Sequence, residues 1–390
     1  MKIVHVTSYF IEDFAKGYQV YQLAKEHVKM NHDVHIITCN QNLNLKNYQE
    51  QAKKLTSSPN INSGSYISDL GATIHRLPIL FSFQNRNWWK GFKEILIEIK
   101  PDILIVHSVL EFQTLRLLFF INKIKCKLII DDHTTINVIR SGISGKIIYL
   151  IFRLFFSKRI YSIASRIIGI SDSCITVLNK YMGLKGEKVL MIPLGTDTTI
   201  FYPDCQKRKA LRNELNLLDN SLLIVYTGKI YDEKKVHLII DVLNELNADQ
   251  YLNIVIYIVG TVYENYKNVL YRHVDKSLNR VVLEDNVSHV KLSYIYNAAD
   301  ISVWPAHTTT STLDASACGS AIICSDYKTE RYRFNSGLGV KDGDYKSLKN
   351  ALKLLIDDEE LRSLMGKNGF NMITNFNSWE KIAADFITIN

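Results

Sequence analysis

Short apolar segments rich in β-branched residues alternate with amphipathic segments along the first half of the chain. The apolar segments read KIVHVTSYF, DVHIITCN, PDILIVHS and CKLIIDDH, and helical patterns such as YQVYQLAKEHVKMN and LEFQTLRLLFFINKI separate them. Continuous hydrophobic strands that alternate with helices are typical of a parallel sheet covered on both faces. The first half is therefore predicted to be a doubly wound α/β domain.

The second half repeats this alternation. Apolar segments SLLIVYTGK, LNIVIYIVG and ISVWPA are separated by helical patterns such as VHLIIDVLNELNA and YENYKNVLYRHVDKSL. Residues 192–204, IPLGTDTTIFYPD, break both periodicities with Pro, Gly and Thr. We therefore expect two Rossmann-like domains, 1–195 and 205–375. The pattern leaves open whether a last helix, at about 376–390, returns to the first domain. Residues 43–70, rich in Asn, Gln and Ser, are expected to form a long surface loop.

Composition fits an ordinary globular protein of this size. The chain has 390 residues, of which 47% are hydrophobic, enough for two cores. Its six cysteines show no C-x-x-C pair, so neither a disulfide framework nor a structural zinc site is indicated. The amino terminus reads as a buried strand, and the longest apolar run, IIYLIFRLFF, is interrupted by Arg153. We expect a cytoplasmic protein.

Charge is divided unevenly between the halves. Residues 1–200 hold 25 Lys and Arg against 15 Asp and Glu, or +10, whereas residues 201–390 hold 22 against 24, or −2. A basic half is compatible with nucleic acid, a membrane surface, an anionic small molecule or an ordinary solvated face. Nucleic acid is disfavoured because the basic residues do not cluster on a recognisable reading element.

Ligands of open α/β sheets bind beyond the carboxyl ends of the strands, where helix amino termini attract anions. Gly17, in FAKGYQVYQLA, opens a helix after the first strand, but no G-x-G-x-x-G is present to indicate a nicotinamide or flavin site. In YTGKIYDEKKVHLII, the strand ends at Gly228, and Lys229, Lys234 and Lys235 follow. These ammonium groups suit a pyrophosphate, although Asp232 and Glu233 on the same loop offer them internal partners.

A run of five hydroxyl residues, Thr308 to Thr312, stands between ADISVWP and the small-residue segment DASACGSA. Such a run could hold phosphate or sugar oxygens on a loop before the helix after Asp314. The alternative is a helix cap, with Ser311 or Thr312 as the capping residue. Capping needs one hydroxyl, and this loop supplies five.

The order of these segments resembles glycosyltransferase family 4. The matching segments are GYQVYQLAKEHVKMNHDVHIIT, KPDILIVH, LIIDDH, IIGISDS, VLMIPLGTD, YTGKIYDEKKVHLII, IYIVG and DASACGSAIICSD, and they cover nearly the whole chain in the family's order. The resemblance implies the GT-B fold, two Rossmann-like domains facing each other across a cleft. It also implies a retaining enzyme that takes sugars from nucleotide diphosphate sugars.

The resemblance implies a role for each matching residue. Gly17 would let the backbone approach the donor phosphates, and Gly228 lies in the matching loop of the second domain. Lys229 and Lys234 would neutralise the leaving pyrophosphate. Lys229 replaces the family's usual Arg and lacks its planar fork, and Lys235 stands where the family has Gly.

Two further positions follow from the same resemblance. His133, in DDHTT, matches the family histidine that reaches the donor sugar; a loop histidine without a role is the alternative. Asp314 matches the second Glu of the family's pair, which is expected to hold the ribose hydroxyls, whereas Ala306 replaces the first Glu. The hydroxyl groups expected to stand in for that acid belong to Thr309, Thr310, Ser311 and Thr312.

No metal or other cofactor is expected. The only D-x-D-shaped segment considered, DGD at 342–344, lies in a polar turn before a helix and is interpreted as a helix cap. The pyrophosphate would be neutralised by basic side chains and helix amino termini. The nucleotide sugar is a substrate.

The acceptor is expected to contact the basic first domain. Residues 85–100 and 145–166 interleave aromatic and apolar residues with Lys and Arg. Such segments suit a membrane interface beside anionic headgroups, and buried helices with charged ends have the same pattern. The expected function is transfer of a hexose from a UDP- or GDP-sugar to a lipid-linked or cell-surface saccharide, for capsule, lipopolysaccharide or O-antigen. The alternative is a non-catalytic GT-B-like partner or regulatory subunit.

Overall fold

The computed structural model describes the whole chain except residues 13–15, 41–61, 84–85, 137–138, 140–142, 249–252, 326–334 and 389–390, with backbone only for 143–146. It divides into two compact units, Met1–Leu194 with Trp379–Asn390, and Gly195–Ser378. The unit boundaries lie close to those expected from the sequence.

The first unit contains an eight-stranded sheet in the order β10-β9-β8-β7-β1-β2-β4-β3. Its strands are parallel except β3, which runs antiparallel to β4. The strand bounds are β1 (Lys2–Val6), β2 (Asp33–Cys39), β3 (Gly64–Ile67), β4 (Thr73–Leu77), β7 (Ile103–His107), β8 (Lys127–Asp132), β9 (Arg166–Gly169) and β10 (Val189–Met191). A separate hairpin pairs β5 (Ile79–Phe83) with β6 (Arg86–Trp89).

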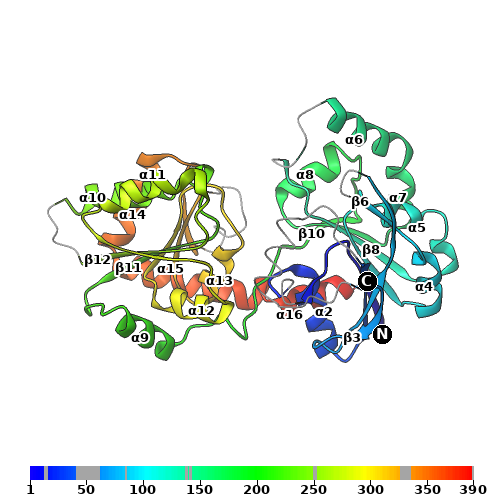
Figure 1. The fold of residues 1–390 in the computed structure, drawn as a ribbon, viewed down its shortest axis with the longest axis horizontal. Helices are drawn as coiled ribbons and strands as arrows, with labels where there is room; N and C mark the ends of the chain where they lie inside the picture. The colour runs from blue at the N-terminus through cyan, green and yellow to red at the C-terminus, as the bar shows by residue number, and fades with distance from the viewer. Residues whose placement is uncertain are drawn as a thin grey trace. The chain divides into compact units, whose positions relative to one another are not determined.

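Helices cover both faces of this sheet (Figure 1). Alternate strand residues such as Val4, Leu104 and Ile130 pack with one group of helices, and their neighbours Ile3, Ile105 and Ile129 pack with the other. The first group is α4 (Phe92–Ile99), α5 (Phe112–Leu117), α6 (Ile143–Phe155), α7 (Ser157–Ile163) and α8 (Asp172–Lys180); the second is α2 (Gln19–Lys29) and α16 (Trp379–Ile387). The last helix therefore packs on the sheet of the first unit.

The second unit contains a six-stranded, wholly parallel sheet in the order β13-β12-β11-β14-β15-β16. Numbered along this unit, the order is 3-2-1-4-5-6, that of dinucleotide-binding sheets. The strands are β11 (Leu222–Thr227), β12 (Ile254–Val259), β13 (Arg280–Glu284), β14 (Ile301–Trp304), β15 (Ala321–Cys324) and β16 (Gly337–Gly339). All six residues of β12 are buried, as a central parallel strand requires.

Helices again form two layers (Figure 1). One layer contains α10 (His237–Leu246), α11 (Glu264–Asp275) and α14 (Tyr345–Asp357), and the other contains α9 (Cys205–Glu214), α12 (His289–Ala298), α13 (Ser311–Ala317) and α15 (Glu359–Met372). Short 3-10 turns occur at Ile121–Lys123 and Asp232–Lys234, and one π-turn at Ile373–Asn377.

The prediction of a surface loop at 43–70 is wrong for its last residues. Residues 41–61 lie outside the described part of the chain, but Gly64–Ile67 form the edge strand β3. The four residues pair with Thr73–Arg76 of β4. A short, largely exposed edge strand has little hydrophobic alternation, so the periodicity did not reveal it.

Candidate functional site

The topological switch point of the second sheet lies between β11 and β14, which are neighbours although a crossover separates them in sequence. Helices leave these two strands toward opposite faces, so the loops at their carboxyl ends form a crevice for ligands. Gly228 and Lys229 follow β11 directly, and the hydroxyl run follows β14. The predicted donor residues of this unit therefore come from the two strands that flank the switch point.

Gly228 lies beside the loop that follows β14. Its φ angle of +132° belongs to a region that side chains rarely adopt. A Cβ atom added there would lie 3.6 Å from the Tyr226 hydroxyl and 4.0 Å from Cγ2 of Thr309. Gly260, after β12, is packed so closely that an added Cβ would fall 1.9 Å from the Gly228 carbonyl oxygen. Close backbone packing therefore fixes the end of β11.

Lys229 and Lys234 lie within electrostatic range of each other. Lys229 is exposed, whereas Lys234 is buried in the 3-10 turn and donates a short hydrogen bond from Nζ to the His307 carbonyl oxygen. Burial lowers the pKa of Lys234, the charge of Asp342 raises it, and the charge of Lys229 lowers it further. Two neighbouring ammonium groups repel each other, and an anion between them would relieve that repulsion.

Lys235 differs from these two lysines. Its backbone is left-handed, with φ +50°, and its Nζ lies 2.9 Å from Oδ2 of Asp232. The internal pairing that the sequence left open is thus realised at Lys235. The ion pair is exposed enough for water and salt to compete with it, so phosphate contact by Lys235 stays a prediction.

The alternative interpretation of the hydroxyl run, a helix cap at Ser311 or Thr312, is wrong. Helix α13 begins at Ser311, three residues before Asp314, and its N-cap residue Thr310 makes no side-chain cap bond. Thr312 donates from Oγ1 to the Thr309 carbonyl oxygen at 2.9 Å, and Ser311 hydrogen-bonds the buried Tyr296 hydroxyl. Both proposed capping residues are therefore inside the helix, and their hydroxyls stabilise its first turn in other ways.

Asp314 lies in the first turn of α13 and is half-buried. Its Oδ1 accepts a short hydrogen bond from the Thr196 hydroxyl, at the start of the second unit. A carboxylate can accept more than one hydrogen bond. Contact with ribose stays a prediction. Ala306, where the family has its first Glu, is buried.

The DGD turn supports the loop after β14, which the sequence did not suggest. Asp342 accepts from the His307 backbone N–H at 2.8 Å, and the Gly343 N–H donates to the Pro305 carbonyl oxygen at 3.0 Å. Asp344 caps α14 by accepting from Ser347 N, which confirms the interpretation of this segment as a helix cap. Hydrogen bonds at both the backbone N–H and the carbonyl oxygen of His307 therefore hold its left-handed φ of +49°.

In the first unit the switch point lies between β1 and β7, with β8 next to β7. Gly17 lies in the turn that precedes α2, whose first residue is Gln19. His133 directly follows β8. Its Nε2 lies 2.5 Å from Oε1 of Gln19 and 3.3 Å from Oδ2 of Asp131. The structure therefore brings His133 and the start of the Gly17 helix together.

These contacts fix the tautomer of His133. Both neighbours of Nε2 are acceptors, so Nε2 carries a hydrogen and Nδ1 is left for a ligand. Burial lowers the pKa of the ring, but the hydrogen bond to Asp131 and the charges of Asp131 and Asp132 outweigh it and raise the pKa. The side chain is 45% exposed, so it is reachable from solvent.

Glu111 is a further candidate that the sequence reading missed. It precedes α5, just beyond the end of β7, and its Oε2 atom is buried. Burial raises the pKa of this carboxyl, and the charge of Arg86 and a hydrogen bond from Ser8 oppose that effect. A buried carboxyl at strand ends suits the binding of a hydroxyl group. A lone glutamate after a strand carries no spacing signal, so only the fold reveals it.

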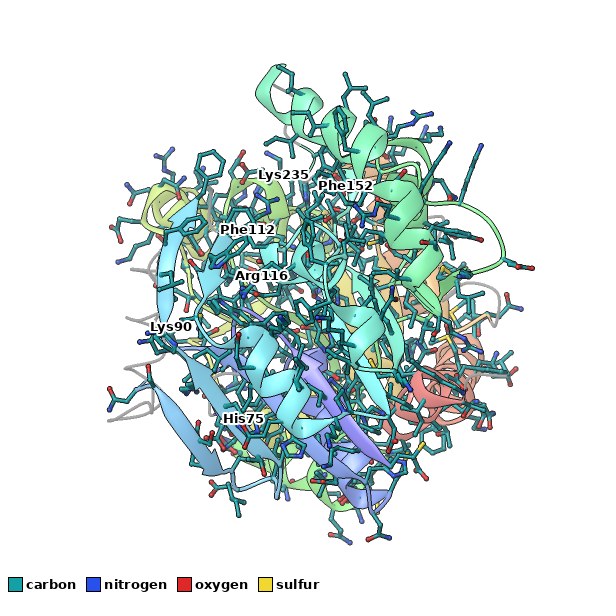
Figure 2. The ribbon with its side chains drawn as sticks, turned by 90° about the vertical axis from the view of Figure 1, so that its right-hand side faces the viewer. His75, Lys90, Phe112, Arg116, Phe152 and Lys235 are labelled. Carbon is teal, nitrogen blue, oxygen red and sulfur yellow. The ribbon has the colours of Figure 1, made fainter. Side chains whose placement is uncertain are left out.

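The acceptor segment at 85–100 is mostly internal where it is described. Trp89 and Phe92 are fully buried and pack edge to face. Trp88 is covered by the guanidinium of Arg116, labelled in Figure 2, which lies 4.5 Å from its ring centroid. The membrane interpretation of Trp89 and Phe92 is therefore wrong, because both rings belong to the core.

The segment at 145–166 differs, because α6 exposes an apolar face. Phe152, also labelled in Figure 2, points into the core, but five other large side chains are 45–68% exposed: Ile147, Leu150, Ile151, Leu154 and Phe155. Arg153, Lys158 and Arg159 are exposed beside them. No described helix is both long and apolar enough to span a bilayer.

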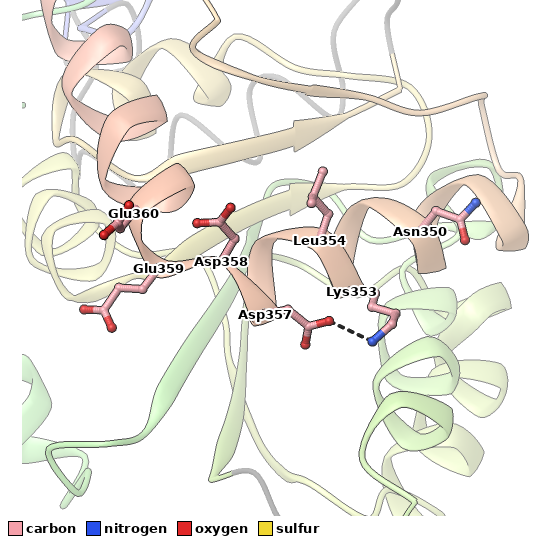
Figure 3. A pocket seen from close by; sticks show the side chains of 7 residues that line it. All are labelled: Asn350, Lys353, Leu354, Asp357, Asp358, Glu359 and Glu360. Carbon is pink, nitrogen blue, oxygen red and sulfur yellow. Dashed lines mark hydrogen bonds and ion pairs between the residues drawn. The ribbon is translucent and has the colours of Figure 1, made fainter.

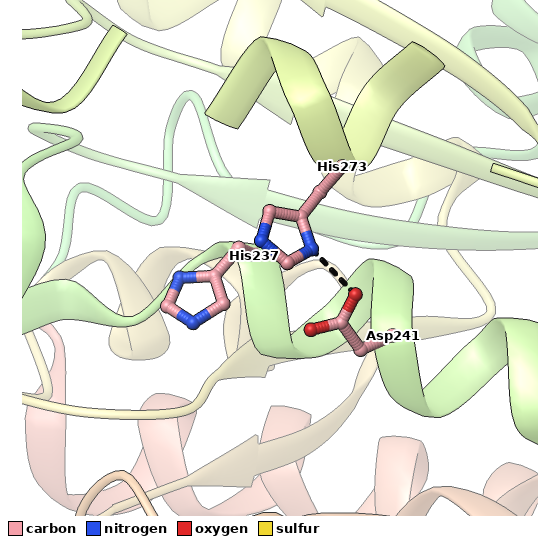
Figure 4. Close-up of side chains that lie close together, drawn as sticks. All are labelled: His237, Asp241 and His273. Atoms are coloured by element: carbon pink, nitrogen blue, oxygen red, sulfur yellow. Dashed lines mark hydrogen bonds and ion pairs between the residues drawn. The ribbon is translucent and has the colours of Figure 1, made fainter. Parts of the chain in front are cut away.

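One group of residues in the described part of the chain has its ligand atoms close enough together for a shared metal ion, and it lies in the second unit. The ligand atoms of His237, Asp241 and His273 all lie within 4.8 Å of one another (Figure 4). Asp241 pairs with Nδ1 of His273 at 2.6 Å, and Nδ1 of His237 lies 2.5 Å from the Tyr266 hydroxyl. In Figure 4 neither nitrogen of His237 points at the Asp241–His273 pair. The three side chains are thus satisfied by protein partners, and metal independence stays a prediction.

An open pocket of about 560 Å³ lies along α14 and the start of α15 (Figure 3). Two of its four acidic residues have local partners, since Asp357 pairs with Lys353 and Asp358 caps α15. The pocket lies away from the strand ends that carry the predicted residues, and an acidic lining disfavours a nucleotide phosphate.

Two family models match the chain. Glycosyltransferase Family 4 matches residues 17–200, and Glycosyl transferases group 1 matches residues 207–372. An uncharacterised glycosyltransferase of Methanocaldococcus jannaschii is 26% identical over 77% of this chain and 78% of the relative. The capsular polysaccharide biosynthesis glycosyltransferase CapM of Staphylococcus aureus is 24% identical over 58% of this chain and 62% of that protein.

A solved structure of similar fold is HepE of Anabaena, crystallised with UDP and glucose. It has a TM-score of 0.65 and 14% identity, with 99% of this chain and 98% of that chain covered. At this identity the likeness shows the fold alone. Taken with the family models and the paired parallel sheets, it establishes what kind of protein this is. The chain belongs to the family 4 type of GT-B glycosyltransferases and is a transferase enzyme.

Proposed function

We propose that the enzyme transfers a hexose from a UDP- or GDP-sugar, with retention of configuration, to a lipid-linked or cell-surface saccharide of a bacterial polysaccharide. The observation that carries the donor class is the pair of ammonium groups on Lys229 and Lys234 at the switch point of a 3-2-1-4-5-6 sheet. A nucleoside diphosphate supplies the anion that such a pair requires. HepE, a protein of the same fold, binds UDP and glucose.

The proposed roles are those that the family resemblance implies. Lys229 and Lys234 neutralise the pyrophosphate as the sugar–phosphate bond lengthens, and Gly228 and the α13 hydroxyls contribute to donor binding in the second unit. In the first unit, Gly17 lets the backbone approach a donor phosphate. Asp314 accepts from the ribose hydroxyls. His133 presents Nδ1 to the transferred sugar, because Nε2 is engaged by Gln19 and Asp131.

The acceptor class is supported by the surface of the first unit. The exposed apolar face of α6, flanked by cationic side chains, suits the interface of an anionic membrane. A lipid-linked saccharide would be delivered at such a surface. CapM, a relative, acts in capsular polysaccharide biosynthesis by its name. We include Glu111 as the group that binds the acceptor hydroxyl.

Nucleotide release from a panel of UDP-, GDP- and other nucleotide sugars tests the proposal. We expect release with one donor class, with and without a chelator, in the presence of membrane-extracted acceptor. Lys234→Ala and Asp314→Ala should abolish or greatly slow it. Lys346→Ala, an exposed residue on α14, is the matched control and should have no effect. Failure of every donor to bind would remove the proposal.

A further inference from the structure

Three buried histidines form a continuous chain through the first unit. His27 lies on α2, His5 on β1, and His107 at the end of β7. Nδ1 of His27 is 3.2 Å from Nε2 of His5, and Nδ1 of His5 is 3.1 Å from Nε2 of His107. The ring of His5 stacks on both of the others, with centroids 5.3 Å and 5.4 Å away.

Both ends of this histidine chain are hydrogen-bond acceptors. At one end Nε2 of His27 lies 3.1 Å from the Ala383 carbonyl oxygen of α16. At the other end Nδ1 of His107 lies 2.9 Å from Oδ1 of Asp131. The Asp131 side chain is fully buried and that of His107 is 6% exposed. Oδ2 of the same carboxylate faces Nε2 of His133.

Proton counting gives the charge of the histidine chain. Three of the four links, from the Ala383 carbonyl to His107, are hydrogen bonds, and the fourth is the 2.9 Å contact between the buried atoms Nδ1 of His107 and Oδ1 of Asp131, neither of which has another hydrogen-bond partner among the described residues. Each link therefore needs one hydrogen between its two heavy atoms. Three neutral imidazoles supply three hydrogens, so with Asp131 ionised one link would join two lone pairs. One additional proton satisfies all four links. The histidine chain and the carboxylate together then carry no net charge, which suits a buried site.

The environment places this proton at the Asp131 end. Burial, followed by the charges of His27 and His107, lowers the pKa of His5 well below its usual value, and burial lowers the pKa of His27 to about 4. Burial raises the pKa of Asp131, but the charge of His107 and hydrogen bonds from His107 and His133 outweigh it and lower the pKa.

The other charged groups do not change this placement. His32, whose ring centroid is 6.4 Å from that of His27, disfavours a charge at the far end. Asp132, next to Asp131 on β8, adds a negative charge near His133. Among the described residues that face the histidine chain, the carboxylates therefore gather near His107.

We propose that His107 is an imidazolium at neutral pH and acts as a positioning residue, holding the Asp131 carboxylate so that His133 keeps Nε2 inward and Nδ1 toward the substrate. This inference rests on the proposed role of His133 toward the transferred sugar. It also links the docking of α16, through the Ala383 carbonyl, to the geometry of His133. His5 and His27 complete the hydrogen bonds that His107 requires.

Nitrogen–proton correlation spectra of the histidine side chains of the full chain test the protonation states directly. Between pH 6.5 and 8 we expect both nitrogens of His107 to be protonated. His5 and His27 should each be protonated at Nε2 alone, whereas His133 should keep its Nε2 proton throughout and lose the Nδ1 proton as the pH rises. A neutral His107 at pH 7 would overturn the inference. The spectra do not depend on activity, so they decide this question even if no donor is turned over.

Substitutions test the positioning role. His107→Leu leaves Asp131 without its buried partner, so we expect His133 to lose its fixed tautomer and kcat to fall about 10- to 100-fold. The KM for nucleotide sugar should change little, because the lysines of the second unit are untouched. His107→Gln keeps a donor toward Asp131 and should restore part of kcat and of the His133 signal.

The matched control is His75→Gln, a buried histidine on β4 of the same sheet that pairs with His35. It should leave the His133 spectrum and kcat unchanged. If His107→Leu does not fold, the His107→Gln variant still tests the positioning role, and the wild-type spectra still test the protonation of His107. Equal kcat in wild type and a folded His107→Leu protein would refute positioning. Transfer activity with a neutral His107 would refute this inference and leave the proposed function intact.

Discussion

Lys229 and Lys234, both predicted to bind the donor phosphates, differ in their contacts with the rest of the protein. Lys229 is exposed, whereas Lys234 is buried and bonded to the His307 carbonyl oxygen. The sequence predicted both as phosphate cations from their spacing after a strand, and that spacing cannot distinguish them. The loop that Lys234 contacts is distant in sequence and is held by Asp342. Only the folded loop shows that Lys234 also has a structural role.

This difference predicts unequal effects of removing the two charges. Lys229→Met should weaken UDP or GDP binding by about 10-fold at low salt, with less loss at high salt, because one screened charge is removed. Lys234→Met should weaken it more, with a salt-independent part, because the His307 loop also loses its anchor. Titration calorimetry at two salt concentrations measures this. Equal losses with equal salt dependence would contradict the structural role of Lys234.

Ser108 carries backbone strain beside the histidine chain. It follows His107 and has a φ of +123°, a region that favours glycine. Its backbone is held by a hydrogen bond from its N–H to the Asp131 carbonyl oxygen and one from the Thr114 hydroxyl to its own carbonyl oxygen. Both bonds would survive replacement by glycine.

Ser108→Gly is therefore expected to raise the free energy of unfolding by about 1 kcal/mol, the relief of strain less the entropy cost of glycine. Urea unfolding measures the change. Ser162→Gly, an exposed position inside α7, is the control and should lower stability by about 1 kcal/mol. A loss of stability in both variants would show that Ser108 is not strained.

The presence of strands and helices was predicted better than the residues at which they begin and end, or the contacts that they make. The alternation of apolar and amphipathic segments indicated the buried strands, but the helix expected after Asp314 begins at Ser311. The hydroxyls of its first turn bond Tyr296 and the Thr309 carbonyl oxygen, contacts that no local pattern encodes. The histidine chain was missed for a similar reason. His5, His27 and His107 become neighbours only through the sheet order, which periodicity does not give.

The exposed face of α6 gives a prediction at the scale of an element. Leu154 and Phe155 are 67% and 68% exposed, and Lys158 and Arg159 lie close by in sequence. Replacing Leu154 and Phe155 together with Ser should reduce flotation with anionic liposomes at least about 10-fold, because apolar burial and headgroup attraction act together.

Leu364→Ser is the matched control for this surface. Leu364 lies on α15 in the second unit and is 53% exposed. It should leave liposome binding unchanged. Equal flotation of wild type and the α6 variant at low salt would remove membrane contact from the proposed function, and transfer to a water-soluble acceptor would then be the remaining form of it.

At the scale of the whole molecule, the two sheets explain why the enzyme class could be predicted although each single motif is degenerate. Several predicted residues follow strands at or near a switch point: Lys229 follows β11, the hydroxyls follow β14, and His133 follows β8, which lies one strand from the β1–β7 switch point. Loops at such points tolerate variation in residue type, as at Lys229, because position is fixed by the sheet. The donor base and sugar depend on side-chain packing around the ligand, which strand patterning does not encode.

Buried histidines of the first unit also predict how the stability of the molecule depends on pH. Burial lowers the pKa of both His27 and His75 to about 4, from 6.5 in the unfolded chain. The unfolded chain therefore binds these protons first as the pH falls. Each residue's contribution is fully present above pH 6.5 and is lost toward pH 4, by up to about 3 kcal/mol. The pKa of His133 is raised, so its contribution to stability changes with pH in the opposite direction, but the side chain is half-exposed and this contribution is small.

Urea unfolding from pH 8 to pH 4.5 should accordingly show a steep loss of stability below pH 6.5. His75→Gln removes one of these titrating groups without touching the histidine chain, so its stability curve should be shallower than that of wild type across this range. Parallel curves would mean that His75 binds its proton equally well in the folded and unfolded states. That result would contradict the burial of His75, on β4, which lowers its pKa.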